Sequence, residues 1–135
     1  MEDLIDLLHT GENTLVVANG EVCTFKGRGI ADLYRLLQND PGFLSGASVA
    51  DKVVGKGAAA LMVLGGISEL YTDVISEPAM TLLKGSPIKV SYRAIVPHIN
   101  NRQGTGLCPV EKLCENSMTA EECLPLIRNF IEKNK

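Results

Sequence analysis

The sequence contains no tryptophan, and aromatic residues make up 4% of the chain. Few rings are therefore present on which single-stranded bases could stack. Basic residues are not in excess either, because 13 lysines and arginines stand against 16 aspartates and glutamates, for a formal net charge of −3. A protein that neutralises a phosphate backbone needs a basic surface. The composition therefore argues against binding to nucleic acid.

The sequence also has no apolar run close to the roughly 20 residues that a membrane helix needs. Residues 1–6 carry acidic side chains where a signal peptide carries basic ones. The four cysteines do not show the paired spacing of a disulfide framework or of a structural zinc site. They are Cys23, Cys108, Cys114 and Cys123. We therefore expect a cytoplasmic protein with free thiols, no bound metal or other cofactor, and no membrane contact.

The bulk of the sequence is that of an ordinary globular protein. Its 135 residues are 45% hydrophobic and 21% charged, and a chain of this length forms one core. We expect a single domain over residues 1–135.

The strongest local signal is Asn19-Gly20 between two runs typical of β-strands. Both residues tolerate the positive φ angles of a two-residue hairpin turn. Such a turn places Val17 opposite Val22.

Several segments have helical patterns. A short helix over residues 4–8 is expected to end at Gly11 in the left-handed conformation, and another follows over 30–37. The apolar stretch from Asp51 to Leu64 predicts a buried helix.

Two further helices have recognisable starts. Ser76 is expected to cap the helix that ends near Gly85. Thr119 and Glu122 form a capping box for the last helix, in which Pro125 favours a new start near residue 124.

Strand patterns at 69–75 and 88–92 alternate with these helices. This alternation favours right-handed crossovers and a largely parallel sheet, to which the hairpin adds an antiparallel pair. The predicted fold class is α/β, a three-layer α-β-α sandwich.

The first candidate site is the Gly-rich segment before Pro109. Pro109 suits the first position of a helix, which would place Cys108 at the N-cap and Glu111 at the third position. The positive end of a helix dipole lowers a thiol pKa and favours nucleophilic chemistry. The alternative is that Cys108 only caps and packs. Polar or flexible neighbours that could help to hold an anion are His98, Asn100, Asn101, Arg102, Gly104, Thr105, Gly106 and Lys112.

The second candidate site is the expected helix start with Asp51, Lys52 and Lys56. It is not a P-loop, because Ala50 and Gly57 stand where that motif needs Gly and Ser or Thr. A helix start that follows a strand still suits an anionic ligand at the sheet edge. Ser76 and Glu77 begin a further helix that would face the same crevice. The alternative is a solvated helix start and an ordinary cap.

Three segments together resemble an uncharacterised bacterial and archaeal family of unknown function, over nearly the whole chain. They are Asp51-Lys-Val-Val-Gly-Lys, Asp73-Val-Ile-Ser and Asn101-Arg-Gln-Gly-Thr-Gly-Leu-Cys-Pro-Val-Glu-Lys. The resemblance implies a cytidine deaminase-like fold with a five-stranded mixed sheet and helices on both faces. Since the patterns supply four strands before Ile95-Val-Pro, the resemblance also implies a fifth.

Zinc deaminases hold their metal with His-x-Glu at one helix start and Pro-Cys-x-x-Cys at the next. The matching starts in this sequence are Val54-Gly-Lys56 and Ser76-Glu-Pro-Ala79, which contain none of these ligands. The resemblance therefore implies the fold without deamination.

We expect a nucleotide-like or phosphorylated small molecule to bind at the helix starts, near Lys52, Lys56, Arg102 and Lys112. The alternative is an enzyme that uses Cys108 as a nucleophile on such a substrate. Deaminase-like folds often assemble, so the resemblance leaves room for a homo-oligomer.

Overall fold

The computed structural model describes residues 1–27, 29–99 and 108–133. Within these residues the chain forms seven helices and five strands. None of these helices is both long and apolar enough to cross a membrane.

The five strands form one mixed sheet in the order β2-β1-β3-β4-β5. β1 is antiparallel to its two neighbours, β2 and β3, while β3, β4 and β5 are parallel. The strands are β1 (Leu15–Asn19), β2 (Glu21–Phe25), β3 (Ser48–Val54), β4 (Glu69–Ser76) and β5 (Lys89–Val96). The five-stranded mixed sheet is confirmed, with the antiparallel hairpin at one side.

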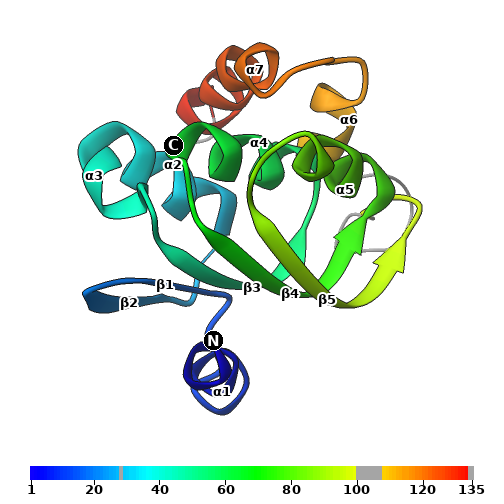
Figure 1. The fold of residues 1–135 in the computed structure, drawn as a ribbon. Helices are drawn as coiled ribbons and strands as arrows, with labels where there is room; N and C mark the ends of the chain where they lie inside the picture. The colour runs from blue at the N-terminus through cyan, green and yellow to red at the C-terminus, as the bar shows by residue number, and fades with distance from the viewer. Residues whose placement is uncertain (28, 100–107, 134–135) are drawn as a thin grey trace.

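The helices cover the two faces of the sheet unequally. Figure 1 shows α1 alone on one face and the other helices on the opposite face, with α7 outside α4. The helices are α1 (Glu2–Thr10), α2 (Gly29–Asn39), α3 (Pro41–Leu44), α4 (Lys56–Gly65), α5 (Glu77–Lys84), α6 (Pro109–Cys114) and α7 (Ala120–Lys133). The α4 helix therefore lies between the sheet and α7.

The small residues of α4 explain its place in the core. Ala59, Ala60, Leu61 and Met62 are all fully buried. At Gly57, a Cβ atom would lie 2.4 Å from Cγ1 of Val110 on α6. Only a residue without a side chain leaves room for α6 at this distance.

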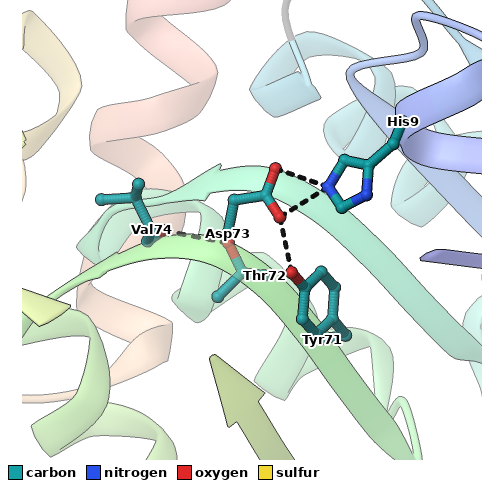
Figure 2. Close-up of polar contacts among 5 residues, drawn as sticks. All are labelled: His9, Tyr71, Thr72, Asp73 and Val74. Atoms are coloured by element: carbon teal, nitrogen blue, oxygen red, sulfur yellow. Dashed lines mark hydrogen bonds and ion pairs between the residues drawn. The ribbon is translucent and has the colours of Figure 1, made fainter. Parts of the chain in front are cut away.

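The single helix on the other face, α1, is fastened to the sheet by polar contacts (Figure 2). Nε2 of His9 lies 2.8 and 3.0 Å from the two carboxylate oxygens of Asp73, and the Tyr71 hydroxyl donates to Oδ1 of Asp73 over 2.6 Å. Burial raises the pKa of Asp73, but the hydrogen bonds from Tyr71 and His9, together with the charges of His9 and Arg93, hold this pKa below its usual value. His9 therefore joins α1 to β4 through the Asp73 carboxylate.

The predicted helix from Asp51 was wrong in its first part. Residues Ser48–Val54 form β3, and the helix starts only at Lys56, after Gly55 as the N-cap. The β-branched valines of this segment pair in parallel with β4. β3 is therefore the strand that the sequence patterns did not supply, while Ile95 belongs to the predicted strand β5.

The hairpin register is shifted by one residue. The turn consists of Gly20 alone, with φ at 81°, so that Val17 pairs with Cys23 instead of Val22. Asn19 stays in the strand because its side-chain amide donates two 2.9 Å hydrogen bonds to backbone carbonyls at the end of α3.

The end of α1 also differs from the prediction. Gly11 has a right-handed conformation with φ at −84°, and Glu12 has the positive φ of 54° instead. Gly11 is needed for space, because a Cβ atom there would lie 2.7 Å from both the Leu7 carbonyl oxygen and Nδ2 of Asn13.

The last helix has the predicted cap but not the predicted restart. The Glu122 N–H donates to Oγ1 of Thr119 over 3.2 Å, which confirms the capping interaction. α7 then continues through Pro125 without a break. A proline removes one N–H donor, and the buried face with Cys123 and Ile127 still holds this helix on the core.

Candidate functional site

A buried carboxylate lies where α4 and α5 begin. Glu111 of α6 is 3% exposed. Its Oε1 accepts hydrogen bonds from the Lys56 N–H and the Ser76 hydroxyl, each over 3.1 Å. Its Oε2 accepts one from the Ile99 N–H over 3.0 Å. One side chain therefore connects three segments that are distant in sequence.

The sheet brings these segments together. β3 and β4 are parallel neighbours, so both end at the same edge, and a helix follows each of them at once. The first N–H groups of a helix have no partner within it, and they attract negative charge. Ser76 caps α5 as predicted, because its Oγ accepts from the Ala79 N–H over 3.2 Å. The same hydroxyl donates to Glu111.

Gly55 leaves the space that the carboxylate needs. A Cβ atom at this position would lie 2.9 Å from Oε2 of Glu111. Any larger residue before α4 would therefore push Glu111 away from the helix starts.

Lys56 contributes two different groups to this region. Its backbone N–H faces Glu111, while its side-chain ammonium donates to the carbonyls of Glu115 and Ser117, just beyond the end of α6. Positive charge stabilises carbonyl groups near a helix C-terminus. The lysine is buried, so its ammonium group is used for contacts within the protein.

The predicted start of α6 is confirmed. Cys108 is the N-cap and Pro109 follows as the first helical residue. The Cys108 thiol forms no capping hydrogen bond, and in the described part of the chain no side chain is hydrogen-bonded to its sulfur. Its backbone N–H donates to the Ile99 carbonyl over 2.9 Å. Cys108 as a nucleophile stays a prediction.

Asp51 and Lys52 are not at a helix start, in contrast to the prediction, because they belong to β3. Asp51 is 4% exposed and lies between Leu15 and Thr72 in the strand register. Burial raises the pKa of Asp51 to about 7, although the N–H groups of Val53 and Lys52 oppose the shift. Asp73 raises this pKa slightly further.

The other predicted residues that the structure describes have no hydrogen bond to the Glu111 carboxylate. Lys52 is half-buried on β3, whereas Glu77 and Lys112 are exposed on the first turns of α5 and α6. Asn101, Arg102, Gly104, Thr105 and Gly106 lie outside the described residues. Within the described residues, no group of three or more His, Cys, Asp or Glu side chains is arranged to hold a metal ion.

Comparison with known proteins agrees with this architecture. The model of the family TM1506, described as "Domain of unknown function (DUF1893)", matches residues 3–131. The chain belongs to the DUF1893 family. It is similar to the crystal structure of a DUF1893 family protein, TM1506 from Thermotoga maritima, with a TM-score of 0.82 and 26% sequence identity. The match covers 98% of this chain and 88% of that one. No curated protein matches the sequence.

Within this DUF1893 domain, Glu111, Lys56 and Ser76 could be named from the sequence, but their arrangement could not. Gly55 was missed because β3 was taken for part of a helix. A glycine between a strand and a helix would have been the signal for this position. The contribution of Ile99 is a backbone N–H, for which the side chain carries no signal.

Proposed function

We propose that this DUF1893 domain binds a nucleotide-like or phosphorylated small molecule at the edge where α4 and α5 begin. The observation that carries the proposal is the buried Glu111 carboxylate, held by the Lys56 N–H, the Ser76 hydroxyl and the Ile99 N–H at 3.0 to 3.1 Å. These are neutral donors aimed at an anion. Backbone N–H groups at helix starts bind phosphate and carboxylate oxygens in the same way.

Glu111 and the ligand compete in this proposal. The anionic group of the ligand takes the donors that Glu111 uses in the free protein, so the carboxylate acts as an internal substitute for it. Loss of the carboxylate therefore strengthens ligand binding, because the ligand no longer has to displace it.

We further propose that the fold is cytidine deaminase-like and that the edge corresponds to the zinc site of those enzymes. The mixed sheet with the order β2-β1-β3-β4-β5 supports the proposal. The two helix starts, Gly55-Lys56 and Ser76-Glu77-Pro78, lack the histidine and cysteine ligands that hold zinc in those enzymes. A hydrogen-bonded glutamate from α6 lies between them. Deamination is not expected, since function depends on the residues of the site.

Calorimetric titration tests the proposal. Wild-type protein, Glu111→Ala and Glu115→Ala are titrated with nucleoside monophosphates, the matching nucleosides and inorganic phosphate. Glu115 is the matched control, because its side chain is exposed just after α6. We expect monophosphates to bind more tightly than nucleosides, and more tightly to Glu111→Ala than to the other two proteins. Absence of binding to all three proteins would refute the proposal.

A further inference from the structure

The hydrogen-bond donors of the proposed site are covered in this structure. Ser76 is fully buried, and Glu111, which accepts from its hydroxyl, is 3% exposed. Lys56, whose backbone N–H donates to the same carboxylate, is buried as well. A ligand can therefore reach these donors only after Glu111 has left them.

α6, which carries Glu111, lies directly against the first turn of α4. A Cβ atom at Gly57 would be 2.4 Å from Cγ1 of Val110, so that Val110 occupies the space beside the Gly57 backbone. Rotation of the Glu111 side chain alone would leave α6 in this position, next to the start of α4. Access for a ligand therefore requires that α6 moves as a whole.

α6 is held in place by few apolar side chains. Val110 and Cys114 are its buried apolar residues, whereas Leu113 is 41% exposed. The other connections of α6 include the three hydrogen bonds to Glu111 and those from the Lys56 ammonium to the carbonyls beyond its end. Elements with few buried apolar contacts open locally, at a lower free energy than global unfolding. The hydrogen bonds of Glu111 thus contribute a large part of what keeps α6 closed.

We propose that α6 is the gate of this site, and that it opens as one unit without global unfolding. Glu111 holds the gate closed until an anionic ligand takes its place at the donors. The gate rests on the proposed function, because it gives access to the same donors. Since the ligand binds the open form, its apparent affinity is reduced by the fraction of molecules that are open. Ligand binding in turn increases that fraction.

The thiol of Cys114 is a probe of the gate, because it is fully buried while α6 is in place. The folded full-length chain is incubated with iodoacetamide at several urea concentrations below the unfolding transition, and alkylation of each cysteine is measured by mass spectrometry. A local opening exposes little surface and depends weakly on urea, whereas global unfolding depends steeply on it. We expect the alkylation rate of wild-type Cys114 to be nearly independent of urea in this range.

Glu111→Gln tests the role of the carboxylate. The amide keeps the size of the side chain, but its nitrogen cannot accept the hydrogen bond that a carboxylate oxygen accepts. We expect Cys114 to be alkylated at least about ten times faster in Glu111→Gln than in wild type. Glu115→Ala is the matched control with an exposed side chain just after α6, and it should behave like wild type. Cys23 on β2 should react at the same rate in all three proteins.

The proposal is overturned if alkylation of wild-type Cys114 follows the urea dependence of global unfolding. This measurement decides the question even if Glu111→Gln does not fold. An unchanged rate in a folded Glu111→Gln protein would overturn the proposal too, as would an equal increase in Glu115→Ala.

A ligand arm separates the gate from the proposed function. Nucleoside monophosphates that bind in the calorimetric titration should raise the alkylation rate of Cys114 in wild type. Binding without this increase would refute the gate and leave the proposed function intact. If no monophosphate binds, the proposed function fails, while the urea dependence and Glu111→Gln still decide whether α6 opens on its own.

Discussion

Replacing Glu111 by alanine removes the one group that satisfies three donors at once. The Lys56 N–H, the Ser76 hydroxyl and the Ile99 N–H all lose their acceptor. A buried donor without a partner costs about 1 to 3 kcal/mol, and such costs overlap when the donors share one acceptor. We expect the free energy of unfolding to fall by about 4 kcal/mol, measured by urea denaturation.

A small carboxylate should restore part of this loss. Formate fits where the side chain was removed and can accept hydrogen bonds from the same donors. At a concentration ten times its dissociation constant it would stabilise Glu111→Ala by about 1.4 kcal/mol. Sodium chloride at the same ionic strength is the control for a general salt effect. Wild-type protein should gain nothing specific, because its own carboxylate already occupies the position.

Glu115→Ala is the matched variant for stability as well. Its side chain is exposed, so we expect a change within about 0.5 kcal/mol. The reasoning would be refuted if Glu111→Ala lost less than about 1 kcal/mol, below the cost of a single unsatisfied donor. Equal stabilisation of wild type and variant by formate would refute it too.

Two further predictions concern stability. Because the pKa of Asp51 in the folded chain is about 7 against an ordinary 3.8, the folded state favours the protonated carboxyl. The contribution of Asp51 to the free energy of unfolding is therefore full below pH 3.8. As the pH rises through about 7, this contribution is lost, which lowers the free energy of unfolding by up to about 4 kcal/mol. Asp51→Asn should therefore be more stable than wild type at pH 8, as measured by urea unfolding. The difference in free energy of unfolding between the two proteins should disappear near pH 4. A difference that does not change with pH would contradict the prediction. Gly57→Ala should cost about 1 to 3 kcal/mol through its clash with Val110, more than its gain in helix propensity. Gly42→Ala, with open space around it, is the control for thermal unfolding, and equal melting temperatures of the two variants would disprove the clash.

The parts of the fold that depend on local chemistry could be predicted from the sequence. Ser76 and Thr119 cap their helices through donors three residues away, and such interactions leave a recognisable spacing. The β3 strand could not be recognised, because valines followed by glycine, lysine and alanines also suit a buried helix. Only pairing with β1 and β4 makes this segment a strand.

The candidate site was less predictable, because its partners come from different parts of the chain. Glu111 stands third in a helix that begins with proline, a position where a glutamate commonly serves its own N-cap. Its carboxylate instead accepts from Lys56 and Ile99, whose contributions are backbone N–H groups. No side-chain pattern marks such donors.

The brevity of α6 has a consequence for the order of folding. Its six residues are too few for a stable isolated helix. The conformational entropy lost in forming the first helical turn exceeds the stabilisation from the hydrogen bonds of that turn. Glu111 near its start and the carbonyls beyond its end both rely on Lys56. Lys56 is in place only when β3 and α4 have formed. α6 should therefore be among the last elements to become protected from hydrogen exchange during refolding, after the parallel strands.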